Sequence, residues 1–275
     1  MIEGAPPSLL DAIRRERLDT VEGAFAFVGG SDLDKPGLGH RRRTRVELAD
    51  GEGGVHLLYL KRYAREPIAA ALRRWWRHGR RRSAARTEFD NIRAARAVGV
   101  ATMEAVACGE EPCPIGAKRS YLLVTAVPGE AMERCFEAFV EAHPADGQVE
   151  AVTRQLARLV RTLHDSGHVH RDLYCSHVFL AESDGRVRLY LIDLARMFAP
   201  RLRRFRWFVK DLAQLKYSMP ASWMKQHWPA FLSEYLVGVG PGGVRRFGRA
   251  IDRKVLRMRR RADRKRRGSG GSQPA

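Results

Sequence analysis

The stretch that most constrains the fold of this chain runs from Val169 to Leu180 and reads V-H-R-D-L-Y-C-S-H-V-F-L. It follows a segment with helical periodicity and precedes the apolar run L-Y-L-I-D-L, which has the pattern of a buried strand and contains Asp193. Asp172 and Asp193 stand 21 residues apart. Two carboxylates are therefore expected in turns at the ends of neighbouring elements.

This layout is typical of a kinase catalytic loop followed by the acid that holds the metal ion. Phosphoryl transfer depends mostly on positioning, because one carboxylate must orient the attacking hydroxyl while another holds the metal that bridges the nucleotide phosphates. We expect Asp172 in the first role and Asp193 in the second. An isolated H-R-D triplet also occurs by chance. The helix before it and the Ile-Asp-Leu after it favour the catalytic interpretation.

Composition indicates a globular protein with an unusual charge. The 275 residues are 44% hydrophobic, enough for one large core or two lobes, and the formal net charge is +19. Part of this charge is a solvated surface. The rest predicts attraction to something anionic, which would be nucleic acid, an acidic membrane leaflet or a phosphorylated substrate.

The cysteines and the apolar runs indicate the compartment. Cys108, Cys113, Cys135 and Cys175 form no C-x-x-C pair and have no clustered histidines, so we expect reduced thiols, without a disulfide framework or structural metal. No stretch approaches about 18 apolar residues, and no charged N-terminal segment precedes an apolar run of roughly 7 to 15 residues. We therefore expect a cytoplasmic protein that at most lies against a membrane.

The first 40 residues predict a helix, a strand and a loop. Residues 1–20 carry apolar side chains near helical spacing, and Ala24 to Val28 is a strand candidate. A glycine-rich lid over nucleotide phosphates would belong here, but without a G-x-G-x-x-G a plain turn is the simpler interpretation. The glycines of this loop are Gly29, Gly30, Gly37 and Gly39.

A hairpin and a helix follow. Thr44 to Leu48 and Val55 to Tyr63 alternate as two strands around D-G-E-G-G. The second strand points Lys61 into a cleft, as suits a lysine that grips nucleotide phosphates, although a lysine that snorkels at a strand end gives the same pattern. Thr87 to Val98 reads as a helix. Its Glu88 is placed to pair with Lys61, and a surface acid favoured by the helix dipole is the alternative.

Arginines and two tryptophans dominate the segment from Arg65 to Arg86. Such a segment rests on lipid headgroups, grips an anionic sugar, or forms a solvated helix whose Trp75 and Trp76 pack inward.

A buried strand and an amphipathic helix are expected next. Tyr121 to Val127 predicts a buried strand that leads into a hinge, and Val149 to His164 predicts an amphipathic helix. Gly167 stands where a left-handed helix cap belongs. This helix delivers the loop that contains Asp172.

The interval between Asp193 and Asp211 contains no Ser, Thr or Tyr. A protein kinase switched by phosphorylation needs a hydroxyl here, and a longer segment as a peptide platform. The interval instead offers a cationic rim suited to an acidic or phosphorylated acceptor. Its members include Arg196, Arg203 and Arg204.

A basic amphipathic helix is expected near the C-terminus. Apolar residues from Val244 to Met258 make a helical stripe, and 13 of the 23 residues from Arg245 to Arg267 are Lys or Arg. This segment holds the protein on an anionic membrane, binds nucleic acid, or is a solvated tail, and the apolar stripe favours the membrane.

Several ordered motifs resemble one family, the lipopolysaccharide core kinases that phosphorylate Kdo or heptose and share a protein-kinase-like fold. The resemblance covers about Arg42 to Ser218. The matching pieces are R-R-T-R, Y-L-K-R-Y, E-F-D-N-I, G-V-A-T-M, L-H-D-S-G-H-V-H-R-D-L-Y-C-S-H, L-I-D-L-A-R and K-D-L-A-Q-L.

The resemblance implies roles for individual residues. Asp172 is similar to the catalytic base, preceded by His170 and Arg171, and Asp193 to the metal ligand. Lys61 and Glu88 resemble the ion pair that grips phosphate. Asp211 resembles the acid that braces the catalytic loop. His177 falls five residues after Asp172, where a protein kinase has a metal-binding Asn. Because Mg²⁺ prefers oxygen ligands, we expect His177 to orient a water or a phosphate.

The resemblance implies an α+β, bilobal fold with a small β-rich lobe and a larger, mainly helical lobe. The implied reaction transfers the γ-phosphoryl group of ATP, with Mg²⁺, to a Kdo or heptose hydroxyl of an anionic glycolipid, the lipopolysaccharide inner core. We expect the enzyme at the inner face of the inner membrane. The expected divisions are a helical extension (1–20), the small lobe (21–127), the large lobe (128–243), and a basic helix with a flexible tail (244–275).

Two other functions remain open. One is a serine/threonine protein kinase, against which the missing hydroxyls after Asp193 speak. The other is an inactive kinase-like module that binds lipid or nucleic acid through the basic helix. The joint presence of Lys61, Glu88, Asp172 and Asp193 favours catalysis, because a binding module does not need all four. We do not expect nucleic acid as a partner.

Overall fold

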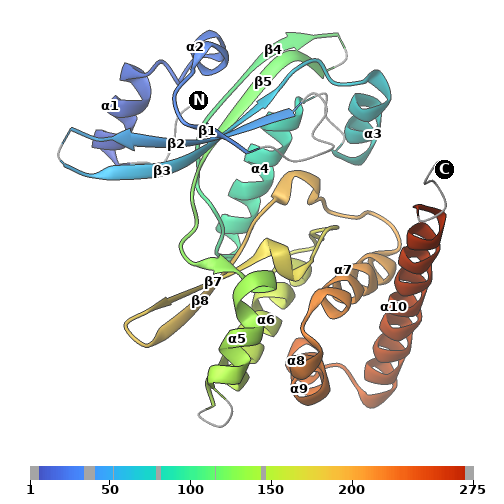
Figure 1. Ribbon diagram of the computed structural model, residues 1–275. Helices are drawn as coiled ribbons and strands as arrows, with labels where there is room; N and C mark the ends of the chain where they lie inside the picture. The colour runs from blue at the N-terminus through green and yellow to red at the C-terminus, as the bar shows by residue number, and fades with distance from the viewer. Residues whose placement is uncertain are drawn as a thin grey trace, which may run out of the picture. The chain divides into compact units, whose positions relative to one another are not determined.

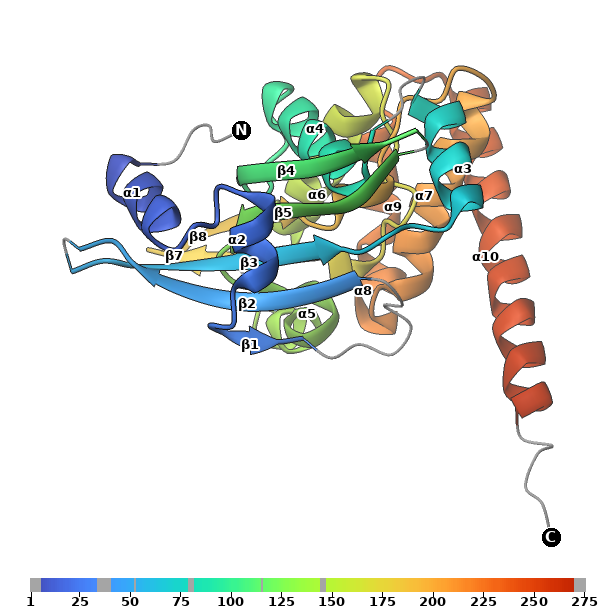
Figure 2. The ribbon, with the colours of Figure 1, turned by 90° about the horizontal axis from the view of Figure 1, so that it is seen from above.

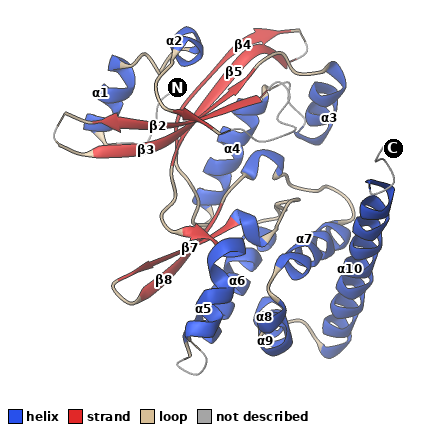
Figure 3. Ribbon diagram, viewed as in Figure 1, coloured by secondary structure: helices blue, strands red, loops and turns tan. Residues whose placement is uncertain are grey.

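The computed structural model describes residues 6–33, 41–51, 53–78, 82–114, 116–143 and 147–269. The chain divides into two compact units (Figure 1). The first comprises Met1–Pro128 and Tyr190–Ala199, and the second comprises Gly129–Leu189 and Pro200–Ala275. The first unit contains the larger sheet, whereas most of the second is helical (Figure 3).

The first unit is built on an antiparallel sheet with the strand order β1-β2-β3-β5-β4. The predicted hairpin is confirmed, and its turn contains Gly51 and Gly53 at φ 84° and 91°, a conformation that favours glycine. Side chains alternate between the two faces, so Leu58 and Leu60 point one way and Lys61 the other. The strands are β1 (Ser31–Asp32), β2 (Arg41–Ala49), β3 (Val55–Tyr63), β4 (Ala105–Cys113) and β5 (Gly116–Thr125).

Helices cover both faces of this sheet (Figure 2). Leu9, Ile13 and Leu18, from α1 and the turn after it, join Leu58 and Leu60 in one buried cluster. On the opposite face α4 packs against β3, β4 and β5. The helices of the unit are α1 (Pro7–Arg15), α2 (Val21–Ala26), α3 (Ile68–His78), α4 (Ala84–Ala97) and the short 3₁₀ helix η2 (Leu194–Arg196).

The predicted strand from Ala24 to Val28 is wrong, because most of that stretch belongs to α2. The cause lies just before it. The side chain of Thr20 accepts a hydrogen bond of 3.0 Å from the backbone N–H of Gly23, which caps the helix. Of the glycines considered for a nucleotide lid, Gly37 and Gly39 lie outside the described residues.

The predicted helix at Thr87 starts three residues earlier. The Ser83 hydroxyl accepts a hydrogen bond of 3.0 Å from the N–H of Arg86 and sets the start of α4 at Ala84. Glu88 therefore lies beyond the first turn and is completely buried, so it is not a surface acid placed by the helix dipole.

The second unit combines a sheet of order β6-β7-β8 with six helices among its described residues. Its core includes the aromatic side chains of Phe136, Trp223 and Phe231. The strands are β6 (Glu130–Ala131), β7 (Val178–Ser183) and β8 (Arg186–Leu191), whose last two residues belong to the first unit. The helices are α5 (Met132–Ala142), α6 (Gln148–Asp165), α7 (Arg204–Ser218), α8 (Ala221–Gln226), α9 (Trp228–Tyr235) and α10 (Pro241–Ser269), with the 3₁₀ helix η1 (Cys175–His177).

Helix α6 confirms the predicted amphipathic helix within one residue at each end. Gly167 has φ 83°, and its N–H donates to the carbonyl of His164 at 2.9 Å. The N–H of His168 donates to Leu163 at 3.2 Å, which completes the cap. The chain is thus turned directly into His170 and Asp172.

Helix α10 is present, but its apolar stripe is not available to a membrane. Ile251 and Val255 are buried, and α10 packs along α7. The ring of Phe247 lies 4.7 Å from that of Phe205 and 6.3 Å from that of Tyr235. The feature that favoured membrane binding by this helix is therefore part of the core of the second unit. No helix in the described part of the chain is both long and apolar enough to span a bilayer.

Candidate active site

A buried ion pair lies on the face of the first unit's sheet that α4 covers. The amino group of Lys61 lies 2.5 Å from Oε1 of Glu88, and the two residues are 6% and 0% exposed. The hydroxyl of Tyr63 donates to Oε2 of Glu88 at 2.7 Å. Burial and the Glu88 charge raise the pKa of Tyr63 well above its usual value, so it remains a donor. Lys61 is therefore not a snorkelling strand-end lysine.

Asp193 lies on the same face of the sheet as this pair. Nη2 of Arg43 is 3.6 Å from Oδ2 of Asp193, and Arg43 is the direct cross-strand partner of Lys61. Directly paired residues of neighbouring strands project from the same face. The first unit thus gathers two cations and two acids, Arg43, Lys61, Glu88 and Asp193, from four separate segments.

Side chains far away in sequence fix the segment around Asp193. Nδ2 of Asn91 donates to the carbonyls of Leu194 and Met197, at 2.8 Å each. The Thr102 hydroxyl donates to the carbonyl of Leu191 at 2.5 Å. Sequence reasoning missed Asn91, although it stands in the E-F-D-N-I motif, one turn after Glu88. The helix that supplies Glu88 therefore also positions the Asp193 segment.

In the second unit, Asp211 braces the turn that leads to Asp172. Its Oδ2 accepts the N–H of His170 at 2.7 Å, and its Oδ1 accepts the N–H of Arg171 at 2.9 Å. Asp211 is completely buried. A carboxylate that accepts two backbone N–H groups fixes the turn with charge-assisted hydrogen bonds. This is the contact expected of an acid that supports a catalytic loop.

Further contacts support this turn. Lys210 donates to the carbonyl of Arg171, and the Arg171 guanidinium lies 5.7 Å from the centre of the Trp207 ring. Nε2 of His164 lies 3.4 Å from Asp211. Arg171 has φ 72°, and Asp193 in the other unit has φ 59°. Left-handed conformations of such residues are strained and cluster at functional sites.

The side chain of His177 contacts the backbone of the loop that contains Asp172. Its Nδ1 lies 2.7 Å from the carbonyl oxygen of Asp172, which only accepts, so this nitrogen carries the proton. Its ring stacks on that of His170 at 5.9 Å. In the neutral ring Nε2 is then the acceptor, which suits a hydroxyl or water better than a phosphate oxygen.

The predicted cationic rim is divided between the units. Arg196 belongs to the first unit, whereas Arg203 and Arg204 belong to the second. All three are exposed, and Nε of Arg204 donates to the carbonyl of Pro200 at 3.4 Å. Their role in acceptor binding stays a prediction.

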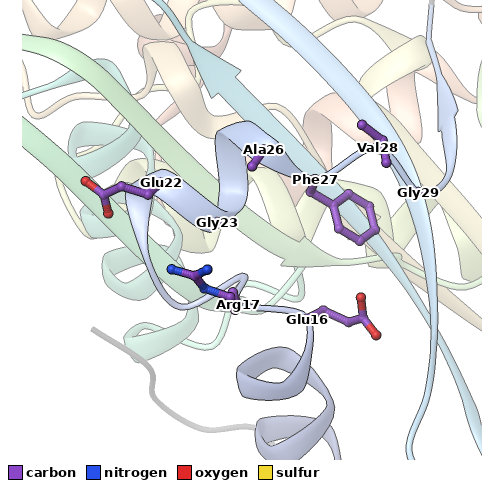
Figure 4. Close-up of a pocket in the computed structure, with 8 residues that line it drawn as sticks. All are labelled: Glu16, Arg17, Glu22, Gly23, Ala26, Phe27, Val28 and Gly29. Atoms are coloured by element: carbon purple, nitrogen blue, oxygen red, sulfur yellow. The ribbon is translucent and has the colours of Figure 1, made fainter.

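A cavity of about 390 Å³ lies in the first unit at the segment from α1 to the loop after α2 (Figure 4). The carbonyl of Phe27, one of its lining residues, accepts a hydrogen bond from Arg62, which points away from the Lys61 side of β3. This cavity is therefore separate from the ion pair. It is lined by Glu16, Arg17, Glu22, Gly23, Ala26, Phe27, Val28 and Gly29.

The Asp193 carboxylate is the kind of ligand that Mg²⁺ accepts. Among the described residues, no group of three or more His, Cys, Asp and Glu side chains is gathered as in a protein-only metal site. Mg²⁺ does not need one, because it is commonly held by one or two carboxylates together with substrate phosphates. The carboxylate of Asp193, 29% exposed, is of the right kind.

Comparisons with known proteins show which enzymes the chain resembles. The chain is 35% identical over 140 residues to the lipopolysaccharide core heptose(I) kinase WaaP of Pseudomonas aeruginosa, which covers 49% of this chain and 52% of the relative. It is also 30% identical over 137 residues to the enzyme of the same name from Escherichia coli. That match covers 48% of this chain and 51% of the relative. The chain thus matches about half the length of these curated relatives.

A solved structure extends the likeness to nearly the whole chain. The structure of WaaP in complex with acyl carrier protein superposes with a TM-score of 0.66 at 25% identity, and covers 96% of this chain and 98% of that one. The predicted α+β, protein-kinase-like fold is confirmed. The model of the lipopolysaccharide kinase (Kdo/WaaP) family matches residues 38–235. The chain therefore belongs to the lipopolysaccharide kinase (Kdo/WaaP) family.

Proposed function

We propose that this protein is an ATP-dependent kinase that phosphorylates a sugar hydroxyl of the lipopolysaccharide inner core. Heptose is the first candidate acceptor because both curated relatives are named heptose(I) kinases, and Kdo is the second. The observation that best supports catalysis is the bracing of the His170–Arg171 turn by both oxygens of buried Asp211. A module that only binds lipid gains nothing from a fixed Asp172.

The residues divide the work of the reaction. Lys61, oriented by Glu88, and Arg43 bind the anionic phosphate oxygens, and Asp172 orients the sugar hydroxyl. As the hydroxyl oxygen bonds to the γ-phosphorus, the bond from that phosphorus to the bridging oxygen breaks and ADP leaves. The carboxylate of Asp172 accepts the hydroxyl proton.

Asp193 would hold Mg²⁺ in this scheme. When bound, the ion neutralises charge that develops on the transferred phosphoryl group. Arg43 restrains the Asp193 carboxylate, and Asn91 fixes the backbone that follows it. The protein therefore supplies a positioned oxygen ligand rather than a closed metal cage.

Transfer of labelled phosphate from ATP to deacylated core oligosaccharides tests this function. We expect label on heptose or Kdo, and none with Lys61→Met. Label on protein substrates alone would favour a protein kinase. Nucleotide and lipid binding without transfer to any acceptor would favour an inactive binding module.

A partner is proposed from the solved relative, which was determined in complex with acyl carrier protein. The net charge of +19 suits any partner with an acidic surface. We expect this chain to co-elute with acyl carrier protein at low salt and to separate from it as salt increases. We place the enzyme at the cytoplasmic face of the inner membrane, where ATP and a membrane-held acceptor are both accessible.

A further inference from the structure

Helix α3 presents an apolar face to solvent. Ile68, Leu72 and Trp76 are 57%, 42% and 86% exposed, and Trp75 is 40% exposed. Their spacing of i, i+4, i+7 and i+8 places them on one side of the helix. The interpretation in which both tryptophans pack inward is therefore wrong for Trp76. In α10, by contrast, the corresponding stripe is buried against α7.

The opposite side of α3 is held by residues just before and just after the helix. Ala71 is 6% exposed. The Arg74 side chain is 11% exposed, forms an ion pair of 2.5 Å with Glu66, and donates to the carbonyl of Arg82 at 2.9 Å. A helix held by this side cannot turn its tryptophans inward without breaking an ion pair whose side chains are only 11% and 12% exposed. The exposed face is therefore the orientation that the local contacts select.

Cations lie along the flank of this face. Arg73 and Arg77 follow one another by one turn on α3, and Arg196 contributes from the same unit. Burial, followed by the charges of Arg196 and Arg73, lowers the pKa of Arg77. Arg73 and Arg196 thus each add repulsion at Arg77, and an anion brought beside Arg77 relieves that repulsion.

We propose that α3 is a docking surface for an anionic lipid bilayer, with Ile68, Leu72 and Trp76 in the interface and the flanking arginines at the headgroups. Helices that lie in the membrane plane have this composition, with Trp and Leu on one face and Arg beside it. Tryptophan favours the membrane–water interface, and each cation near an anionic leaflet adds attraction. The surface is an addition to the proposed function, and its binding does not require phosphoryl transfer.

Vesicle binding of the full chain tests this surface. Phosphatidylcholine vesicles with and without phosphatidylglycerol are compared by co-sedimentation. We expect the double variant Leu72→Ala/Trp76→Ala to bind anionic vesicles about tenfold more weakly, from the apolar area no longer buried. Arg73→Gln/Arg77→Gln should weaken binding by about fivefold for each charge. The matched control is Leu256→Ala, which truncates a 49% exposed leucine on the basic helix α10 and should bind as wild type does.

A second readout locates the contact. Lipids brominated near the headgroup quench tryptophan that enters the interface, and Trp223 and Trp228 are buried elsewhere. We expect quenching in wild type and a marked loss of it in Trp76→Phe. The proposal would be overturned if Leu72→Ala/Trp76→Ala bound anionic vesicles as wild type does. It would also be overturned if Trp76→Phe showed the same quenching as wild type. Binding of α3 to a soluble acidic protein in place of vesicles would also overturn it.

The variants also separate this proposal from the proposed function. Leu72 and Trp76 are exposed, so we expect the free energy of unfolding of the Leu72→Ala/Trp76→Ala variant to stay within about 0.5 kcal/mol of wild type. Transfer to a soluble, deacylated acceptor should be unchanged, whereas transfer to an acceptor embedded in anionic vesicles should fall with vesicle binding. Equal loss on both acceptors would show that α3 serves catalysis and not docking.

Discussion

Arg43 and Asp193 form an ion pair of 3.6 Å between strand β2 and the turn after β8. Because Arg43 is also the cross-strand partner of Lys61, one basic residue connects the lysine of the candidate phosphate site with the acid of the candidate metal site. The pair is partly exposed, with side-chain exposures of 24% and 29%, so substrate can reach it. We therefore expect Arg43 to contact the nucleotide phosphates, which a glycine-rich loop covers in protein kinases.

Arg43→Gln should raise the KM for ATP more than it lowers kcat, because it removes one cation from the phosphates and one restraint from Asp193. An interaction with a charged group is worth about 1.5–3 kcal/mol, so we expect a rise of about tenfold or more. Arg45→Gln is the control, since Arg45 points from the same face and pairs with Glu47. Equal effects of the two variants on the KM would contradict the role given to Arg43.

Asp211→Asn should impair catalysis without impairing nucleotide binding. The amide offers one oxygen to the two N–H groups of His170 and Arg171, so one buried donor loses its acceptor at a cost of about 1–3 kcal/mol. We expect lower kcat and stability with an unchanged Kd for ATP, measured by kinetics, urea unfolding and nucleotide titration. The control is Asp252→Asn, because Asp252 is an exposed residue of α10 that pairs with Lys216 of α7. This variant should change neither kcat nor stability.

The stripe on α10 should matter for folding. Ile251→Ala removes a completely buried side chain between α10 and α7 and should cost about 2–5 kcal/mol in urea unfolding. Leu256→Ala, half exposed on the same helix, should cost less than about 0.5 kcal/mol. Similar small effects of both variants would mean that α10 is not packed on the second unit. Deleting residues 245–275 is therefore expected to destabilise the protein and not merely to release it from membranes.

Much of the candidate site follows from local patterns. Short stretches of sequence determine three of its parts through periodicity or turn glycines. These parts are the hairpin that carries Lys61, the helix before Asp172 and the helix cap at Gly167. Glu88 was expected to pair with Lys61 from the strand and helix patterns, and that contact is present. Asp211 was placed by the family resemblance alone, and its catalytic support role stays a prediction.

The remainder depends on contacts that no local pattern encodes. Whether an apolar stripe is buried or exposed depends on its neighbours, and the stripes of α3 and α10 have opposite fates for this reason. The bonds from Asn91 to the segment after Asp193 join residues about a hundred positions apart. The missed helix α2 is different, since Thr20 three residues before Gly23 is a capping signal that the sequence displays.

Cys108 should make stability sensitive to alkaline pH. Burial, followed by the charge of Glu110, raises the pKa of this thiol to about 12. In the unfolded chain the thiol loses its proton near pH 8.5. Its contribution is thus fully present below about pH 8.5 and decreases as the pH rises toward 12. Between pH 7.5 and 10, the loss of unfolding free energy should be about 1–2 kcal/mol smaller in Cys108→Ala than in wild type. Parallel pH profiles would contradict this assignment.

The most direct measurement compares wild type with Asp172→Asn for transfer of labelled phosphate from ATP to heptose- and Kdo-containing core acceptors, with nucleotide affinity measured on the same samples. We predict sugar-linked phosphate with wild type, a fall of about 10²–10⁴-fold or more in the variant, and equal ATP binding by both. Transfer by the variant at the wild-type rate, or no transfer to any core sugar by the wild-type protein, would contradict the proposed kinase.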